Sequence, residues 1–318
     1  MSTIDSLRMG LHWARATASY LAWTRGETAK GSGRVQAGDI NIFYKWFGFG
    51  EPILMLHGGF TVIEGWVAQI PELSRSYLLI GMDSRGHGRT TLGTAGLTYR
   101  QLGRDAAALL DILNTGPVTV LGLSDGGNAA LGLALERPDL VKGLVLMGTS
   151  LNLENGIEDK RAAAESFLSN TSPELPFLRL ATSLMNPESG SWPRFLEQMR
   201  TLWTAPSDVT LDDISAIEAP ALIIAGDKDE FLALPSDPLA IFEALRDAMP
   251  NAAMTVIPSG SHGLHIEYAK TVNRLILDFM RDPYGEFPPI SSPAAEPSRS
   301  IAARWASLFS TFARDTNR

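Results

Sequence analysis

The sequence lacks cysteine entirely and has few histidines. None of its 318 residues is cysteine, and only five are histidine. Without cysteine the chain can form no disulfide bridge, no thiolate zinc site and no cysteine nucleophile. Any nucleophilic side chain in this protein must therefore belong to Ser, Thr, Asp, Glu, Lys, Tyr or His.

Basic residues are scarce relative to acidic ones. The chain has 27 Lys and Arg residues against 35 Asp and Glu residues, which gives a formal net charge of −8. A negatively charged surface repels the phosphate backbone of DNA and RNA. We therefore expect no nucleic acid partner.

Long apolar runs are missing as well. No stretch reaches the roughly 18 to 20 apolar residues that a membrane-spanning helix requires. The first thirty residues contain no uninterrupted apolar region followed by an A-x-A cleavage pattern, because charged or imidazole side chains interrupt the apolar positions: Arg8, His12, Arg15 and Arg25. We therefore expect no signal peptide, no membrane-spanning helix and a cytoplasmic location.

The apolar residues that are present form a regular alternation of short runs and longer periodic segments. Continuous runs, typical of strands buried on both faces of a parallel sheet, lie at 53–56, 77–81, 118–121, 143–147, 221–225 and 254–257. Segments with helical spacing of apolar residues lie at 99–113, 126–136, 238–249 and 271–280. An antiparallel hairpin is expected around the turn Ala37-Gly38-Asp39. The alternation predicts an α/β fold, with a mostly parallel central sheet flanked by helices.

Three further segments stand apart from this α/β core, which we expect at 34–151 and 216–285. Residues 152–215 are helix-prone and contain no convincing strand, so they predict a helical cap over the sheet. Residues 1–33 predict an N-terminal amphipathic helical extension, and 286–318 a linker followed by a C-terminal amphipathic helix. We expect these two ends to pack on the body or on each other, or else to contact a membrane surface or a second copy of the chain.

Ser124 lies in the segment Gly122-Leu123-Ser124-Asp125-Gly126, between a predicted strand and a predicted helix. A serine hydroxyl is a poor nucleophile, so an enzyme must expose it, supply a base and stabilise the oxyanion. Glycines two positions before and after the serine permit a sharp turn that exposes it. The helix N-terminus favours negative charge near its oxygen. The alternative is an ordinary turn serine, but the strand and helix on either side favour a nucleophile.

The base must be one of the five histidines. His262 follows the last predicted strand, 254–257, and the loops after parallel strands share one edge of the sheet, where they can meet Ser124. His265, three residues further on, is the second candidate. The remaining histidines lie in the N-terminal extension or in glycine-rich loops after earlier strands: His12, His57 and His87.

An orienting carboxylate and two oxyanion donors complete such a site. The segment after strand 221–225 supplies three acids on the same edge: Asp227, Asp229 and Glu230. For the oxyanion, the backbone N–H of Asp125 supplies one donor. The second would come from Gly59 or Phe60, in the glycine-containing loop after strand 53–56.

These residues resemble the α/β-hydrolase family over roughly 35–281. The motifs occur in the order typical of that family: His57-Gly58-Gly59, 83–89 (DSRGHGR), 122–127 (GLSDGG), 226–229 (GDKD) and Gly260-Ser261-His262. The resemblance implies the α/β-hydrolase fold, with Ser124 as nucleophile, Asp229 as acid and His262 as base. It also implies that the 83–89 loop, which contains His87, is structural. The implied mechanism needs no metal and no organic cofactor.

Departures from particular branches of the family bear on the substrate. Serine at position 124 argues against haloalkane dehalogenases and epoxide hydrolases, which have aspartate there. Gly263 and Phe60 depart from the pattern of meta-cleavage carbon–carbon bond hydrolases. The Ser-Asp-Gly-Gly turn is similar to that of valacyclovir hydrolase, whose substrates carry an amino group. Asp125 would then meet a cation, or else cap the helix that begins beside it. The segment His262-Gly263-Leu264 resembles cofactor-free haloperoxidases and perhydrolases.

We therefore expect a serine hydrolase that cleaves a carboxylic ester or lactone of a small hydrophobic molecule through an acyl-enzyme intermediate. Trp66, Trp192 and Trp203 are candidates to contact the hydrophobic group, or are simply core residues. The alternatives are a cofactor-free perhydrolase or haloperoxidase-like activity, and a carbon–carbon bond hydrolase. A small-ligand receptor with the same triad and a membrane-associated scaffold are also alternatives.

Overall fold

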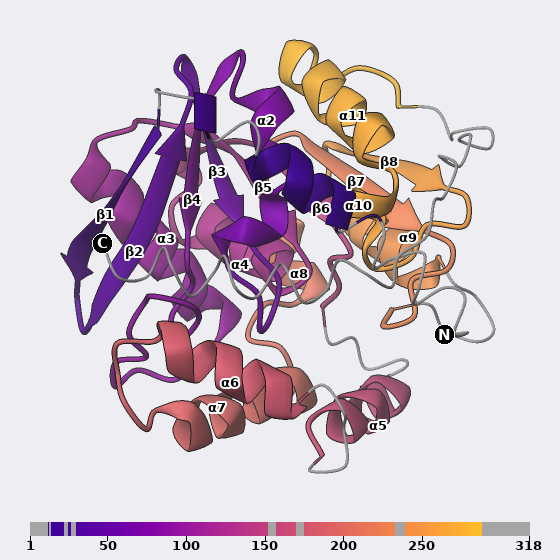
Figure 1. Ribbon diagram of the computed structural model, residues 1–318. Helices are drawn as coiled ribbons and strands as arrows, with labels where there is room; N and C mark the ends of the chain where they lie inside the picture. Colours follow the sequence, from indigo (N-terminus) through magenta and orange to yellow (C-terminus); the bar gives the residue numbers. More distant parts are fainter. Residues whose placement is uncertain are drawn as a thin grey trace.

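The computed structural model describes residues 12, 14–21, 25–26, 30–151, 157–169, 175–232 and 239–287 (Figure 1). The predicted C-terminal amphipathic helix lies outside these residues, as does much of the N-terminal extension. Of that extension, residues 14–21 are helical, and the ring of Tyr20 packs edge-on against Phe47 at 6.4 Å between centroids. Among the described residues, no helix has both the length and the apolar character needed to cross a membrane.

An eight-stranded sheet forms the centre of the described part, in the order β1-β2-β4-β3-β5-β6-β7-β8. β1 pairs antiparallel with β2 and β2 antiparallel with β4, whereas all other neighbouring strands are parallel. The strands are β1 (Lys30–Ala37), β2 (Ile40–Phe47), β3 (Glu51–Leu56), β4 (Tyr77–Met82), β5 (Val118–Leu123), β6 (Val141–Met147), β7 (Ala221–Gly226) and β8 (Ala252–Ile257). The predicted mostly parallel sheet and the hairpin at its edge are both confirmed.

The continuous apolar runs form strands because both faces of the sheet are covered. Successive side chains of a strand point to opposite faces. In β3, Leu54 and Leu56 belong to one buried cluster, while Ile53 and Met55 belong to the other. Every residue of β5 and of β7 is buried. Strands of this kind are apolar at nearly every position rather than at alternate ones.

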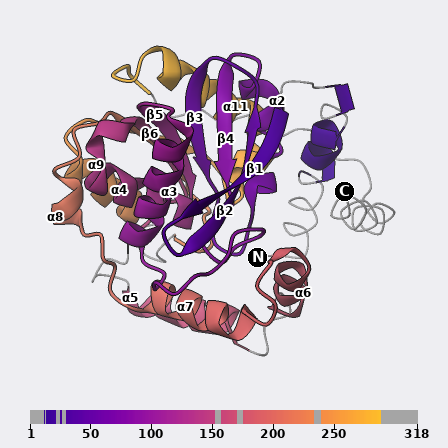
Figure 2. The ribbon, with the colours of Figure 1, turned by 90° about the vertical axis from the view of Figure 1, so that its left-hand side faces the viewer.

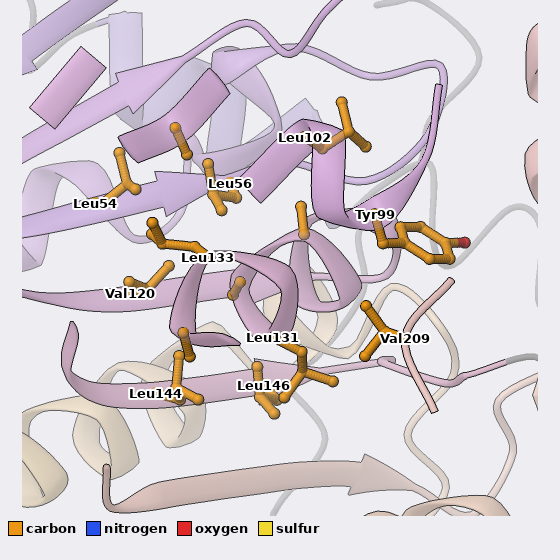
Figure 3. Packing of buried hydrophobic residues seen from close by; sticks show 14 of the residues in the cluster. Leu54, Leu56, Tyr99, Leu102, Val120, Leu131, Leu133, Leu144, Leu146 and Val209 are labelled. Atoms are coloured by element: carbon orange, nitrogen blue, oxygen red, sulfur yellow. The ribbon is translucent and has the colours of Figure 1, made fainter. Parts of the chain in front are cut away.

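Helices cover the two faces in separate layers (Figures 1 and 2). The first cluster includes residues of α3 (Tyr99–Leu113), α4 (Asp125–Glu136) and α9 (Ala240–Ala248). The second includes residues of the 3₁₀ helix Ile63–Trp66, α2 (Ile70–Leu73), α10 (Leu264–Glu267) and α11 (Ala269–Arg281). Figure 3 shows leucines of α3 and α4 packed over the first face. At this crossing a Cβ on Gly103 would lie within 2.5 Å of the Gly132 carbonyl carbon, so both helices need glycine to approach closely.

The helix-prone block forms α5 (Ile157–Phe167), α6 (Leu175–Met185), α7 (Trp192–Thr204) and α8 (Leu211–Ile214). In Figures 1 and 2, α5, α6 and α7 lie together on one side of the sheet, and α7 contacts both of the others. We refer to α5, α6 and α7 as the cap.

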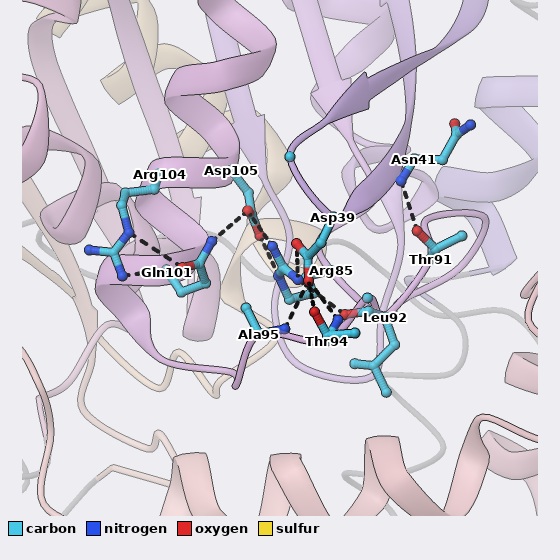
Figure 4. A network of polar contacts seen from close by, with 12 residues as sticks. Asp39, Asn41, Arg85, Thr91, Leu92, Thr94, Ala95, Gln101, Arg104 and Asp105 are labelled. Carbon is cyan, nitrogen blue, oxygen red and sulfur yellow. Dashed lines mark hydrogen bonds and ion pairs between the residues drawn. The ribbon is translucent and has the colours of Figure 1, made fainter.

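A buried arginine orders the loop after β4 (Figure 4). Arg85 donates to Asp105 of α3 at 2.7 and 2.8 Å, and pairs with Asp39 in the β1–β2 turn at 2.8 Å. It also donates to the carbonyl oxygen of Leu92 at 3.2 Å. A buried guanidinium needs such partners to offset its lost hydration. Arg85 therefore serves the fold, as the resemblance implied for this loop.

Candidate active site

Ser124 occupies a strained turn between β5 and α4. Its backbone has φ 54° and ψ −122°, a conformation that non-glycine residues rarely adopt. The flanking glycines make room for this turn. A Cβ on Gly122 would lie 2.5 Å from the Cα atom of Gly127, and a Cβ on Gly126 would overlap the carbonyl oxygen of Leu56. The sequence pattern Gly-x-Ser-x-Gly therefore marks a turn that only these small residues allow.

The structure distinguishes the three acids that follow β7, and it places Asp229, the acid that the resemblance implied, beside His262. Asp229 is completely buried, and its Oδ2 and Oδ1 lie 2.9 and 3.1 Å from His262 Nδ1. By contrast, Asp227 accepts a hydrogen bond from the backbone of Ser259 at 2.6 Å. Glu230 accepts one from the backbone N–H of His262 at 3.1 Å. Only Asp229 is therefore placed to orient the imidazole ring.

Backbone hydrogen bonds hold the Asp229 carboxylate in place. Its Oδ1 accepts from the N–H groups of Phe231 and Leu232 at 3.0 and 3.1 Å. These bonds satisfy a charge that would otherwise be buried without compensation. These bonds fix the position of the Asp229 carboxylate independently of its bond to His262.

Ser124 and His262 both lie near the end of β6. The backbone N–H of Ser124 donates to the carbonyl oxygen of Met147 at 2.8 Å. A Cβ on the next residue, Gly148, would lie 2.9 Å from His262 Cε1 and 3.0 Å from Nδ1. The imidazole therefore lies against the backbone one residue beyond the group that anchors the serine. Ser124, Asp229 and His262 are brought to the same edge of the sheet.

The charges around His262 favour its protonated form. Burial alone would lower the pKa of His262, whereas the charge and hydrogen bond of Asp229 raise it. Glu230 and Asp125 act in the same direction as Asp229. The pKa of His262 is therefore raised above the ordinary histidine value of 6.5. A base of this kind accepts a proton readily and stabilises the resulting imidazolium.

The second candidate for the base, His265, lies elsewhere. It is buried in α10, and its ring packs edge-on against Trp66 at 5.7 Å between centroids. Burial lowers the pKa of His265 to about 3. Trp66 is itself fully buried in the second core cluster. Trp66, one of the three tryptophans that the sequence analysis singled out, is therefore a core residue.

His57 and His87 are buried ring neighbours, with 5.2 Å between centroids. His57 Nε2 accepts a hydrogen bond from the backbone of Ser84 at 3.0 Å, which holds two loops together. Burial lowers the pKa of His57, and it lowers the pKa of His87 to about 3. Both rings are therefore neutral at ordinary pH. Their role is to order the loops through hydrogen bonds.

The predicted oxyanion donors lie beside Ser124. A Cβ on Gly58 would lie 3.2 Å from Ser124 Cβ, so the 57–60 loop touches the serine. Phe60 in this loop has φ 56°, a second non-glycine residue with strained backbone. Asp125 is the first residue of α4, where the backbone N–H groups have no partner inside the helix.

Trp192 and Trp203, which the sequence analysis singled out, belong to an aromatic cluster over this loop whose other members the sequence did not predict. The ring of Phe60 contacts four aromatic rings of the cap, at centroid distances from 5.4 to 6.1 Å: Phe167, Trp192, Phe195 and Trp203. These residues and Phe60 are called the aromatic cluster below. Phe231, 45% exposed, contacts both Phe167 at 6.3 Å and His262 at 4.9 Å. The signal in the sequence was the concentration of aromatic residues within the cap.

Among the described residues, no group of three or more His, Asp or Glu side chains is placed to hold a metal ion. The chemistry that the site offers on its own residues is a hydroxyl, an imidazole and a carboxylate beside backbone donors.

A serine in a sharp turn after β5, an aspartate after β7 and a histidine after β8 define a hydrolase on a mostly parallel sheet. Residues 53–275 match the model of the alpha/beta hydrolase family, and the chain belongs to this family. The family assignment and the fold expected from the sequence are confirmed.

Individual relatives differ in the reactions that they catalyse. The chain is 28% identical to 2-hydroxymuconate semialdehyde hydrolase of Pseudomonas sp. (strain CF600), over 74% of this chain and 88% of that one. It is 24% identical to the serine hydrolase BPHL of Mus musculus, over 80% and 88%. It also resembles the solved structure of Est816, an N-acyl homoserine lactone degrading enzyme. The TM-score is 0.63 at 24% identity, over 78% of this chain and 100% of that one. That last similarity shows the fold alone.

Proposed function

We propose that the protein hydrolyses a carboxylic ester or lactone of a small hydrophobic molecule, with Ser124, His262 and Asp229 as catalytic triad. The observation that carries this proposal is the pairing of His262 with the fully buried Asp229 at 2.9 Å, beside a serine held at φ 54°. Each of these features is costly for the fold, and together they meet the requirements of a serine nucleophile.

In the first half of the proposed reaction, His262 Nε2 takes the proton from Ser124 Oγ as that oxygen bonds to the carbonyl carbon. The carbonyl oxygen becomes an oxyanion, which accepts hydrogen bonds from backbone N–H groups of Asp125 and the 57–60 loop. When the tetrahedral intermediate collapses, the carbon–oxygen bond to the alcohol breaks. His262 returns the proton to that alcohol, and the acyl group stays on Ser124.

In the second half, a water molecule replaces the alcohol. His262 takes a proton from water as the water oxygen bonds to the acyl carbon, and a second oxyanion forms in the same position. Its collapse breaks the bond to Ser124 Oγ, which regains the proton from His262 and releases a carboxylic acid. Asp229 keeps Nδ1 protonated throughout, so that Nε2 alone exchanges protons.

The aromatic cluster supports a hydrophobic substrate. Phe60 belongs to the loop beside the nucleophile, and Phe167 and Trp203 reach it from the cap, with 5.7 Å between their own centroids. Aromatic rings contribute large apolar area with few rotatable bonds, which favours binding of an apolar acyl or alcohol group.

A second candidate is hydrolysis of a carbon–carbon bond, which the similarity to 2-hydroxymuconate semialdehyde hydrolase supports. A substrate panel distinguishes the two. It would comprise p-nitrophenyl esters of increasing acyl length, an N-acyl homoserine lactone and a ring-cleavage dienone.

We expect repeated turnover of the esters or the lactone, with kcat/KM rising with acyl hydrophobicity. Cleavage of the dienone without turnover of any ester or lactone would contradict the proposal in favour of the second candidate. Stoichiometric cleavage that stops after one equivalent would contradict it in favour of a ligand receptor.

A further inference from the structure

The side chain of Asp125 does not cap α4, which is one of the two roles that the sequence suggested for it. Its Oδ1 accepts a hydrogen bond from Tyr99 Oη at 2.9 Å, and its Oδ2 accepts one from Trp203 Nε1 at 2.8 Å. Both oxygens are therefore engaged by neutral donors of the protein itself. The carboxylate is buried, and these two bonds offset the hydration that it loses.

The two donors come from opposite sides of the site. Tyr99 is the first residue of α3 and belongs to the core, whereas Trp203 lies near the end of cap helix α7. The segment after α7 also contacts the N-terminus of α3. Asp208 accepts from the backbone N–H groups of Tyr99 and Arg100 at 2.9 and 3.1 Å. Asp125 thus links the nucleophile turn to the place where the cap rejoins the core.

The 57–60 loop meets these groups at Gly59. A Cβ on Gly59 would overlap Asp125 Oδ2 and would lie 2.8 Å from Trp203 Cζ2 and 3.2 Å from Met199 Cε. A cavity of about 10 Å³, lined by Gly59, Asp125 and Leu202 among others, has room for a single water molecule. Loop, carboxylate and cap are therefore in close packing, and a shift of one moves the others.

The Asp125 carboxylate also acts on the base. It is one of the three carboxylates that raise the pKa of His262. Burial raises the pKa of Asp125 itself above its ordinary value, while the bonds from Trp203 and Tyr99 act in the opposite direction. Loss of a donor would thus disturb both the packing and the charge beside the triad.

We propose that Asp125 is a positioning residue, which holds cap helix α7 and the 57–60 loop in register with Ser124 through its bonds to Trp203 and Tyr99. The expected effect on catalysis rests on the proposed function, whereas the expected effect on the cap does not.

The test begins with Trp203→Phe, which removes the N–H donor and keeps an aromatic ring against Phe60. We expect kcat to fall by about 10- to 100-fold, the size of effect that a displacement of about 1 Å produces, with KM changed by less than about threefold. Trp46→Phe is the matched control, because Trp46 lies on β2, away from the cap, and this variant should keep full activity.

A double-mutant cycle with Asp125→Asn then isolates the bond. The asparagine keeps the shape of the side chain and its backbone N–H, but removes the charge. We expect Asp125→Asn to cost less in the Trp203→Phe background than in the wild-type protein. It should also move the acid limb of the kcat/KM profile to lower pH, because a carboxylate that raises the pKa of His262 has been removed.

Amide hydrogen exchange of residues 192–204 gives a readout that does not depend on any substrate. Trp203→Phe and Asp125→Asn should both increase exchange in α7, whereas Trp46→Phe should not. Unchanged exchange in α7, or additive effects in the cycle, would overturn the inference. If wild-type protein turned over no ester or lactone while α7 exchange still rose, the proposed function would fail and the positioning role would stand.

Discussion

Replacement of Ser124 by alanine is expected to lower kcat for ester hydrolysis by on the order of 10⁴- to 10⁶-fold. The change removes the one atom, Oγ, that forms the bond to the acyl carbon. The fold should persist, because the anchoring bond to Met147 comes from the backbone of residue 124 and the strained φ of 54° is already tolerated. Stopped-flow hydrolysis of p-nitrophenyl acetate and thermal unfolding would measure the two effects.

The matched control for this variant is Ser259→Ala. Ser259 is also a serine with positive φ, 62°, and is exposed in the loop after β8. Its side chain has no part in the proposed reaction, so activity should stay within about twofold of wild type. Undiminished turnover by Ser124→Ala would contradict the nucleophile assignment.

Replacement of Asp229 by asparagine is expected to lower kcat by on the order of 10⁴-fold. Asparagine keeps the acceptor for the N–H groups of Phe231 and Leu232, but directs an amide or an uncharged oxygen at His262 Nδ1. The ring then loses both the bond that selects its tautomer and the charge that stabilises its protonated form. Steady-state kinetics of this variant, with its far-UV circular dichroism spectrum, would measure the effect.

The pH dependence of kcat/KM provides an independent check on the same pair. A base works only when deprotonated, and Asp229 and its neighbours raise the pKa of His262 above 6.5. Wild-type activity should therefore fall as the pH drops through a value above 6.5. In Asp229→Asn the fall should occur at lower pH.

Asp227→Asn is the control for this variant, since Asp227 faces the backbone of Ser259 rather than the imidazole. It should retain activity within a few-fold of wild type. A loss in Asp227→Asn equal to that in Asp229→Asn would contradict the assignment of the acid.

Much of the fold could be predicted because its strands are buried on both faces. The run at 53–56 is wholly apolar, the run at 118–121 has Thr119 as its one polar residue, and the glycine spacing around Ser124 leaves one turn geometry open to the chain. Where the strands end was less predictable. β5 continues to Leu123, because the last residue of the strand is set by pairing with β6 and not by its own sequence.

The contacts within the site were harder to predict from the sequence. Asp227 and Asp229 are two residues apart in one loop, and only the path of the backbone decides which carboxylate turns toward His262. The bonds of Asp125 to Tyr99 and Trp203 span 26 and 78 positions of the sequence. Contacts at that separation depend on how the cap packs, and no local pattern encodes them.

The central claim is that Ser124 carries the acyl group during turnover, and rapid-quench mass spectrometry tests it most directly. Wild-type protein would be mixed with p-nitrophenyl butyrate, quenched in acid within milliseconds and digested to peptides. The mechanism predicts a mass increase of one butyryl group on the peptide that contains Ser124, and none in Ser124→Ala. Turnover with the label on another side chain, or with no label at any time, would contradict it.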